Sequence, residues 1–434
     1  MAVIGGGWAG CAAGVELAQS GVSVHLFEAA RTLGGRARLV EVNGRLLDNG
    51  QHILLGAYRE TLRLMRIAGI DPARALLRLP LQMRYPEGSG MDFVTPRLPA
   101  PLHMLAGLLR AKGLDRDDKF ALARFSSTAR WMDWTLNDDC TVAELLERWD
   151  QTERLVQLMW RPLCIAALNT PPQHASAQVF LNVLRDSLGA RRAASDMLIP
   201  RVDLSALFPQ RAGAFIEQHG GTVRLGSGVQ RLRRDDAGWR IEMSAAANTV
   251  LPAFDAVIIA TQPGHAASLL DGIADTSAIG GLAFEPITTC YLQYDPALAL
   301  AQPFFALRDD PATGHWGQFV FDRGQLEPSN AGLLAVVVSA SGEAVALDQE
   351  ALAAAIAAQL AQVFRQPSLA TPAWSKVISE KRATFACTPG LARPANATGI
   401  EGLYIAGDYT AGDYPATLES AVRSAVAAAR ELTA

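Results

Sequence analysis

Three glycines near the start of the chain have the spacing of a phosphate-binding turn: Gly5, Gly7 and Gly10 form G-x-G-x-x-G directly after a short apolar strand. The first glycine permits a tight turn, the second lets the backbone approach a pyrophosphate, and the third allows the next helix to pack closely on the strand. The N-terminus of that helix offers free N–H groups to phosphates. A second strand ends at Glu28, whose carboxylate can accept a hydrogen bond from a ribose hydroxyl. This order of elements predicts a dinucleotide-binding unit.

Two further motifs have residue types that suit the same ligand. Leu33-Gly34-Gly35-Arg36 follows the second strand after a short linker, and the planar guanidinium of Arg36 suits phosphate oxygens. Near the other end of the chain, the apolar strand 402–406 runs into Gly407-Asp408, and an alanine-rich helix starts near Ala416. A surface turn and a plain terminal helix are the alternatives, but neither explains why these motifs accompany the glycine turn.

A parallel sheet surrounded by helices is expected to position these motifs. The run 254–261 is apolar and rich in β-branched residues, as in a parallel strand that is buried on both faces. Residues 56–69 have the pattern of an amphipathic helix that ends at Gly69. Residues 114–190 look mostly helical, and residues 281–340 alternate like strands. The simplest interpretation adds a mixed sheet and a helical cap to the parallel sheet.

Composition limits the classes of protein that fit. Of 434 residues, 50% are hydrophobic and 19% are charged, which is enough to bury a large core, and the net charge of −4 gives no sign of nucleic-acid binding. Five scattered cysteines with no metal-like spacing are typical of a reduced, intracellular protein. We expect no signal peptide, because the dinucleotide strand starts at Met1, and no transmembrane helix. The expected location is therefore the cytoplasm.

The acid at residue 28, the Leu-Gly-Gly-Arg motif and the terminal Gly-Asp motif together resemble the flavoprotein family of amine oxidases and phytoene desaturases. The resemblance implies the α/β class, with a Rossmann-type FAD-binding domain, an inserted mixed-sheet substrate domain and a helical cap. It implies a discontinuous FAD-binding domain over residues 1–75, 210–265 and 395–434, a mostly helical cap over 76–209, and a substrate domain over 266–394.

The same resemblance assigns the residues that would bind FAD. Arg36 is expected at the pyrophosphate, Asp408 at the ribityl chain, and the backbone of Val229 at the adenine. The helix near Ala416 would direct its positive N-terminal end at the flavin ring, where it would stabilise the anionic reduced form. The full predicted set is Gly5, Gly7, Trp8, Ala9, Gly10, Glu28, Gly35, Arg36, Gly50, Gln51, Val229, Gly407, Asp408, Ala416, Thr417 and Leu418. No metal site is expected.

Three segments narrow the resemblance to one group of this family. The loop 48–52 reads Asp-Asn-Gly-Gln-His and resembles the same loop in the squalene-associated FAD-dependent desaturases, a group understood as hydroxysqualene dehydroxylases. Segments 159–171 and 380–389 resemble the same group. The resemblance implies that hydroxysqualene, a C30 isoprenoid alcohol, loses its hydroxyl and receives hydride from N5 of reduced FAD. The product would be squalene, which places the chain in squalene and hopanoid biosynthesis.

His52 is the candidate catalytic residue for this reaction. The resemblance places it beside the flavin, and the pKa of an unperturbed histidine lies near neutrality, as an acid for the leaving hydroxyl requires. A structural histidine that bonds the backbone of a tight loop is the alternative. Asp48 fits a turn residue bonded to local N–H groups, and Asn49 and Gln51 fit residues that organise the loop.

Two other features suit a long hydrocarbon substrate. Aromatic side chains could line a tunnel and stabilise positive charge with their ring faces, although core packing is the alternative for each of Trp160, Phe180, Tyr291, Phe319 and Phe321. Segment 97–112 carries a leucine stripe with basic flanks, so it either lies on a membrane surface or packs on the protein. Peripheral membrane contact and association with squalene-synthase-like enzymes are the expected partnerships.

Three other functions remain open from the sequence. A carotenoid-type desaturase or isomerase would share the fold but oxidise its polyene. A flavin amine oxidase would need an aromatic cage beside the flavin, for which Tyr409 and Tyr414 are candidates. A non-catalytic FAD-binding partner that delivers substrate within an isoprenoid complex is the third.

Overall fold

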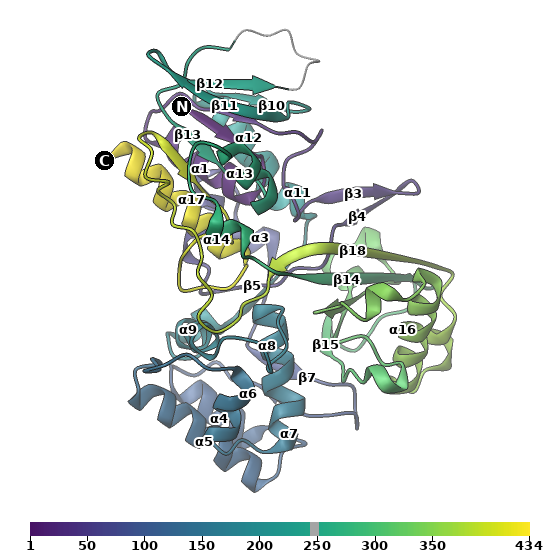
Figure 1. The fold of residues 1–434 in the computed structure, drawn as a ribbon. Coiled ribbons are helices and arrows are strands. Elements are labelled where there is room, and N and C mark those ends of the chain that lie inside the picture. The colour runs from purple at the N-terminus through teal and green to yellow at the C-terminus, as the bar shows by residue number, and fades with distance from the viewer. Residues whose placement is uncertain (244–250) are drawn as a thin grey trace.

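A five-stranded parallel sheet carries both ends of the chain (Figure 1). The computed structural model describes residues 1–243 and 251–434; residues 244–250, within the predicted segment 210–265, lie outside the described residues. The strand order is β10 (Thr222–Arg224), β2 (His25–Phe27), β1 (Ala2–Ile4), β13 (Val257–Ile259) and β19 (Leu403–Ile405). All four pairings are parallel. The predicted α/β class with a Rossmann-type sheet is confirmed, and the strands are shorter than the apolar runs that predict them.

Helices cover this sheet, and almost every residue of the first helix, α1 (Trp8–Gln19), is buried. α1 packs against α12 (Pro209–Gln218), α17 (Leu418–Thr433) and α2 (Arg59–Ile67). Its small side chains permit this close packing, and the buried carboxylate of Glu16 is paired with Arg63 at 2.6 Å and Arg430 at 2.8 Å. The amphipathic helix predicted over 56–69 is α2, and Gly69 follows it with a φ of +81°.

A second sheet lies beside the first and is antiparallel in all of its named pairs, whereas the sequence predicts a mixed sheet. Its order is β15 (Phe304–Ala306), β16 (Phe319–Asp322), β17 (Leu333–Ser339), β14 (Phe284–Gln293) and β18 (Trp374–Phe385). Parallel neighbours need long crossover connections, whereas the antiparallel neighbours β15, β16 and β17 follow one another directly along the chain. α16 (Gln349–Val363) packs on one face, and the long strands β14 and β18 extend toward the parallel sheet (Figure 1).

Helices form the lower part of the molecule in Figure 1, as predicted for residues 114–190. The main ones are α4 (Leu102–Arg110), α5 (Arg116–Trp131), α6 (Val142–Arg148), α8 (Arg161–Leu168) and α9 (Ala177–Ser187). Trp160 lies at their centre, where its ring centroid is 4.2 Å from that of Phe125 and its indole N–H donates to Gln151. Phe180 is fully buried against Trp160. These two rings therefore form core and not the wall of a tunnel.

Several pairs of short strands lie outside the two main sheets. β3 (Leu39–Val42) and β4 (Arg45–Asp48) form a hairpin that ends at the start of the loop 48–52. β5 (Leu54–Leu55) and β6 (Leu76–Leu79) both pair with β9 (Met197–Pro200). β7 (Gln82–Arg84) pairs with β8 (Asp92–Val94), and α4 packs on β8. β11 (Val229–Asp235) pairs with β12 (Gly238–Met243). The short helices α11 (Leu204–Leu207) and α15 (Arg323–Leu326) flank the loop. The predicted domain boundaries stay a prediction.

Candidate functional site

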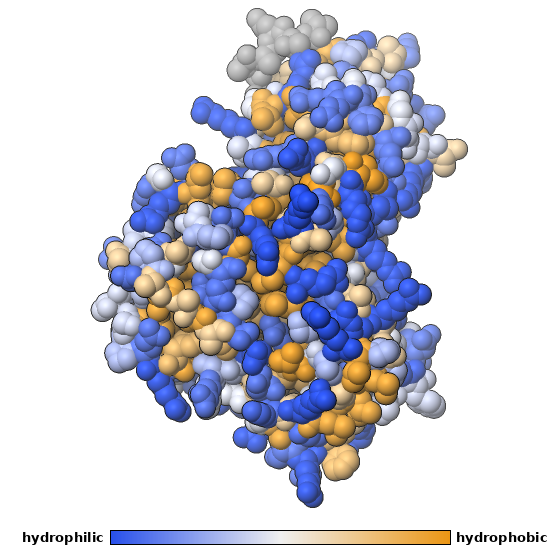
Figure 2. Space-filling view, turned by 180° about the vertical axis from the view of Figure 1, so that it is seen from behind, coloured by the Kyte–Doolittle hydropathy of each residue, from blue (hydrophilic) through white to orange (hydrophobic). Residues whose placement is uncertain are grey.

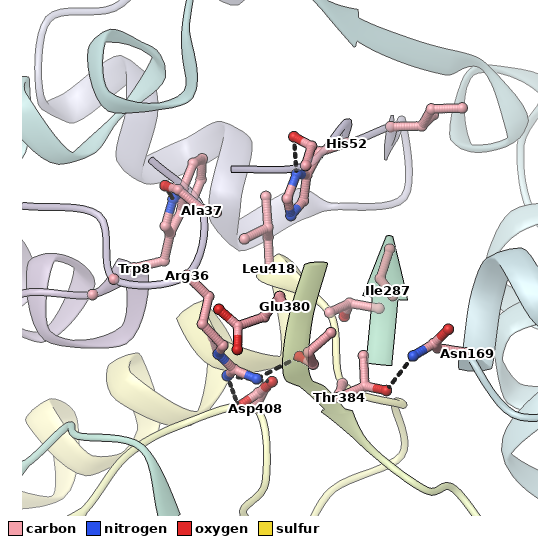
Figure 3. Close-up of a pocket in the computed structure, with 18 of the residues that line it drawn as sticks. Trp8, Arg36, Ala37, His52, Asn169, Ile287, Glu380, Thr384, Asp408 and Leu418 are labelled. Carbon is pink, nitrogen blue, oxygen red and sulfur yellow. Dashed lines mark hydrogen bonds and ion pairs between the residues drawn. The ribbon is translucent and has the colours of Figure 1, made fainter. Parts of the chain in front are cut away.

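A cavity of about 680 Å³ lies where the parallel sheet, the antiparallel sheet and the helices meet. Sequence-predicted residues on its wall are Gly5, Gly7, Trp8, Ala9, Glu28, Gly35, Arg36, Gly50, Gln51, His52, Val229, Gly407, Asp408, Ala416, Thr417 and Leu418. Gly10 is the exception, because it lies below the wall between helix and strand. Residues that are hundreds of positions apart in the sequence are thus brought to one site (Figure 3).

The glycines form a backbone cradle in which a side chain would not fit. Gly5 has a φ of +103°, and a Cβ on Gly10 would lie 1.8 Å from the Gly5 carbonyl oxygen. A Cβ on Gly35 would lie 3.0 Å from the Cα of Gly7. Gly7 is also the N-cap of α1 and supplies no side-chain cap. The first N–H groups of α1 are therefore available to an anion on the cavity side.

Glu28 fixes the turn around this cradle. Its two carboxylate oxygens accept hydrogen bonds from the backbone N–H of Gly6, at 2.5 Å, and of Ala30, at 2.7 Å. On the same wall, the carbonyl of Val229 accepts a hydrogen bond of 2.9 Å from the His265 ring. A carboxylate has about four acceptor positions, so Glu28 retains acceptor capacity for a ligand.

Arg36 and Asp408 join the N-terminal and C-terminal motifs. Arg36 donates one hydrogen bond of 2.7 Å to each carboxylate oxygen of Asp408 and a third of 2.5 Å to the carbonyl of Ala383 (Figure 3). α17 begins at Leu418 beside this pair, and the hydroxyl of Thr417 caps it by accepting from the N–H of Ser420. An arginine, a carboxylate and a helix N-terminus therefore face one region of the cavity.

The remaining wall of the cavity is mostly apolar. It is lined by Leu81, Met83, Leu163, Ile165, Val183, Leu184, Leu188, Met197, Ile287, Phe304, Phe319, Phe321, Val337 and Ile378. Phe319 and Phe321 are candidates from the sequence. Phe304, which no sequence motif indicates, packs against both at ring-centroid distances of 5.6 Å and 5.1 Å. Phe304 and Phe321 are register partners on β15 and β16. The alternation of phenylalanines along β16 could have indicated this face, but its partner strand could not be identified.

Tyr291, another candidate for the tunnel, does not line the cavity. Its hydroxyl donates a hydrogen bond of 2.8 Å to the backbone carbonyl of Asp48, and its side chain is buried between the sheet and the loop 48–52. The hydroxyl requires a partner when it is buried, so packing against the loop satisfies it. Tyr291 therefore supports the loop and does not contact the cavity.

His52 extends from this loop into the cavity (Figure 3). Its Nδ1 lies 3.3 Å from the Gly50 carbonyl, and because a carbonyl only accepts, Nδ1 carries the proton and Nε2 is the acceptor of the neutral ring. Burial lowers the pKa of His52 below its ordinary value, the Gly50 carbonyl opposes this shift, and the positive charge of Arg36 adds to it. At neutral pH the ring is therefore neutral, which favours a hydrogen-bond acceptor over a proton donor.

The segments 159–171 and 380–389 meet at the cavity, which gives a structural reason to consider them together. Asn169 has a φ of +48°, accepts from the N–H of Ala340 and donates a hydrogen bond of 2.9 Å to the hydroxyl of Thr384. Glu380 lines the same wall (Figure 3). The sequence marked these segments by resemblance but assigned no role to any of the three residues. Within residues 1–243 and 251–434, no cluster of His, Cys, Asp and Glu could hold a metal ion.

Known proteins resemble this chain along nearly its whole length. The family model described as flavin containing amine oxidoreductase matches residues 8–433. A hydroxysqualene dehydroxylase from Rhodopseudomonas palustris is 30% identical, over 97% of this chain and 95% of the relative. One from Sinorhizobium fredii is 27% identical over the same shares. A 15-cis-phytoene desaturase from Glycine max is 24% identical, over 98% of this chain and 77% of the relative. The solved structure of a cyclohexylamine oxidase from Brevibacterium oxydans matches this structure with a TM-score of 0.68 and 17% sequence identity. The match covers 100% of this chain and 99% of the oxidase chain, which shows a shared fold.

Proposed function

The chain belongs to the family of flavin-containing amine oxidoreductases, and within it to that of the hydroxysqualene dehydroxylases, and from this we propose that it converts hydroxysqualene to squalene. It is an FAD-dependent oxidoreductase. In the proposed reaction a C–O bond is replaced by a C–H bond, with consumption of a hydride and a proton and release of water. Both the glycine cradle and the apolar compartment of the cavity support this proposal.

The observation that carries the proposal is the continuity of these two compartments. The wall that runs from Gly7 and Glu28 to Arg36 and Asp408 suits a charged dinucleotide, and it opens into a wall of aliphatic and phenyl side chains. A hydrocarbon chain gains about 25 cal/mol for each Å² of apolar surface that it buries. A long, almost wholly apolar substrate with one polar atom matches such a cavity.

The residues present fit FAD. The cradle of Gly5, Gly7 and Gly35, which a Cβ would fill, would hold the pyrophosphate at the N-terminus of α1, and Glu28 would accept from a ribose hydroxyl. Arg36 and Asp408 would bind the phosphate and ribityl groups, and the N-terminus of α17 would face the ring. Bound in its reduced form, FAD supplies hydride to a carbon atom held against its ring.

The chain's own residues would bind the substrate and exclude water. The aliphatic side chains would hold the hydrocarbon extended, and the ring faces of Phe304, Phe319 and Phe321 would stabilise positive charge that develops as the C–O bond lengthens. His52 would accept a hydrogen bond from the substrate hydroxyl at Nε2 and so orient the leaving group. This role differs from the proton donation expected from the sequence, because the neutral ring has no proton at Nε2.

Other members of the family suggest other reactions, which the cavity supports less well. The phytoene desaturase is the more distant relative in sequence. For an amine oxidase, Tyr409 and Tyr414 were the cage candidates, but only Tyr414 lines the cavity, and its hydroxyl is bonded to Asp186. Tyr409 is buried outside the wall. A non-catalytic carrier would not need an ionisable ring such as that of His52 at the edge of a mostly apolar wall.

We further propose that α4 and α5 rest on a membrane surface. Leu102, Leu105 and Leu109 of α4 are 53%, 52% and 66% exposed, and Phe120 and Trp131 of α5 are 70% and 87% exposed. They extend outward at the helical end of the molecule, where Figure 2 shows hydrophobic side chains on the surface. Among the described residues no helix is long and apolar enough to cross a bilayer. A surface-lying amphipathic segment is the mode of contact that fits.

Charge and connectivity support the same surface. Residues 97–131 contain seven Lys and Arg against three Asp, although the whole chain has a net charge of −4. Anionic headgroups attract such a basic segment. Behind it, Gly107 of α4 packs on Phe93, and Phe93 is the register partner of Met83, which lines the cavity. The hairpin of β7 and β8 therefore separates the exposed helix from the apolar compartment. A substrate that is dissolved in the bilayer would have a short path into the cavity. The same holds for a substrate that squalene-synthase-like enzymes deliver at the membrane surface.

The experiment that tests the main proposal is product analysis with competing substrates. Purified holoenzyme is reduced without oxygen and incubated with hydroxysqualene, and in parallel the oxidised enzyme is incubated with phytoene and with amines. We expect squalene from the first reaction and no product from the others. Desaturated polyene from phytoene, or peroxide from an amine, without any squalene would assign the chain to another reaction of its family.

A further inference from the structure

The loop that carries His52 is held from two opposite sides. On the side of the parallel sheet, the backbone N–H of Asn49 donates a hydrogen bond of 2.8 Å to the carbonyl of Arg38. The side-chain amide of Asn49 donates one of 2.9 Å to the carbonyl of Arg36. On the opposite side, its partners come from elements more than 150 residues away in the sequence. These distant contacts are made to Asp48, the first residue of the loop, and to Gln51, the residue directly before His52.

Arg323 is the centre of the distant side. Its guanidinium donates to the side-chain oxygen of Gln51 at 2.9 Å and to Asp48 at 3.3 Å. The other oxygen of Asp48 accepts from the N–H of Leu204 at 2.8 Å, and the Asp48 carbonyl accepts from Tyr291. The side chains of Arg323 and Asp48 are only 7% and 3% exposed. Burying both charges is costly unless each keeps its partners, so the network demands one arrangement of the loop.

The antiparallel sheet fixes where Arg323 stands. Arg323 is the first residue of α15, directly after β16, and Asp322 caps this helix by accepting from the N–H groups of Gly324 and Gln325. The second oxygen of Asp322 accepts from Leu300 at 2.9 Å. Because β16 also carries Phe319 and Phe321 on the cavity wall, the strand that lines the apolar compartment ends in the residue that holds the loop.

We propose that Arg323 is a positioning residue: by binding Gln51 and Asp48 together, it holds the loop so that Nε2 of His52 faces the substrate hydroxyl. This inference rests on the proposed function for the role of His52, but the placement of the loop can be tested without turnover. Since Asn49 anchors the loop independently on the FAD side, loss of Arg323 leaves the cofactor cradle intact. Of the residues predicted to bind FAD, Arg323 contacts Gln51, whereas Arg36 and Asp408 keep their own contacts, so loss of Arg323 is expected to act through the position of His52.

The first test measures amide hydrogen exchange over residues 47–56 in the holoenzyme. Arg323→Met removes every hydrogen bond from the guanidinium and is expected to raise exchange in this peptide, while Arg323→Lys raises it less. Arg161→Met is the matched control, because Arg161 pairs with Asp309 of the same sheet region and makes none of the hydrogen bonds that hold the loop. If Arg323→Met does not fold, Tyr291→Phe, which removes one hydroxyl, replaces it. Equal exchange in variant and control would overturn the proposal.

The second test is a double-mutant cycle in squalene formation. Arg323→Met should lower kcat by about tenfold or more, since small displacements of a catalytic group have large effects, with FAD content unchanged. In the His52→Ala background the same substitution should lower kcat less than about twofold, because coupled residues are not additive. Full additivity, or loss of FAD in Arg323→Met, would contradict a positioning role. If the unaltered enzyme forms no squalene, the proposed function fails and the exchange experiment still decides the placement of the loop.

Discussion

Arg36 donates two hydrogen bonds of 2.7 Å to the carboxylate of Asp408, and this single pair joins motifs that are 372 residues apart in the sequence. Both bonds come from Nη2 of the guanidinium, while Nη1 donates to the carbonyl of Ala383, and a hydrogen bond between two charged groups is roughly twice as strong as one between neutral groups. The pair ties the turn after β2 to the end of β19, the strand before α17. This contact therefore adds to the packing of α1 on α17 in bringing the two ends of the chain to one binding wall.

We predict that Asp408→Ala weakens FAD binding. A hydrogen bond to a charged group contributes about 1.5–3 kcal/mol, so the Kd for FAD should rise by about ten- to a hundredfold. The measurement is a titration of apoprotein with FAD, followed by the change in flavin fluorescence. Asp408→Asn, which keeps an acceptor oxygen, is expected to bind with intermediate affinity. An unchanged Kd in Asp408→Ala would remove Asp408 from the cofactor site.

Gly10→Val should prevent FAD binding altogether. The Cβ would lie 1.8 Å from the Gly5 carbonyl oxygen, so helix and strand would have to separate at the cradle. We expect colourless protein with a lower midpoint of thermal unfolding. Gly342→Val is the control, because a Cβ on Gly342 has no atom within 4 Å. Yellow Gly10→Val protein with full flavin content would contradict the assignment of this turn.

The extent to which the sequence predicted the site follows from how local each interaction is. The cradle of Gly5, Gly7 and Gly10 depends on neighbours in the chain, so spacing alone was enough. The partner of Arg36 is Asp408, and both were predicted for the cofactor, yet nothing in the sequence showed that they bind each other. Arg323 and Phe304 were missed because their roles depend on which strands pair, which only the folded sheet reveals.

The structure changes the predicted roles of Trp160 and His52, in both cases because the folded chain buries the ring and gives its N–H a hydrogen-bond partner. Trp160 was a candidate for the tunnel, but a large ring with one N–H packs well at the centre of a helical bundle and bonds Gln151 there. His52 was a candidate proton donor on the ordinary pKa of histidine. Its burial, which residue type alone does not predict, makes the ring neutral, and its bond to the Gly50 backbone, the alternative that the sequence offers, leaves Nε2 as the acceptor.

The role of His52 predicts a pH dependence of known sign. Burial lowers the pKa of His52 below that of an ordinary histidine, so the ring is neutral at neutral pH and gains a proton only as the pH falls below that ordinary value. As an acceptor, His52 should therefore cause kcat/KM to fall on acidification, and a proton donor would cause it to rise. His52→Gln should lack this limb and keep its FAD. If kcat/KM instead rises toward acidic pH in the unaltered enzyme and not in His52→Gln, His52 is the proton donor.

Replacing Leu102, Leu105 and Leu109 by serine should weaken binding to vesicles that contain anionic lipid. These side chains are exposed, so their loss should leave FAD content and thermal stability unchanged, while each leucine that enters the bilayer contributes about 1.5–3 kcal/mol. Co-sedimentation with vesicles measures the effect. The matched control replaces Leu46, Leu225 and Leu347, which are exposed elsewhere on the molecule. Equal sedimentation of the two triple variants would exclude α4 as the contact surface.

The most direct measurement for the account is a single turnover of fully reduced holoenzyme with hydroxysqualene in the absence of oxygen. The absorbance of oxidised flavin and the amount of squalene are followed together. We predict that squalene forms and that one flavin is oxidised for each squalene, because the chain is an FAD oxidoreductase whose cavity joins the cofactor cradle to a hydrocarbon compartment. Flavin that stays reduced while hydroxysqualene persists, in protein that is folded and fully loaded with FAD, would contradict the proposed function.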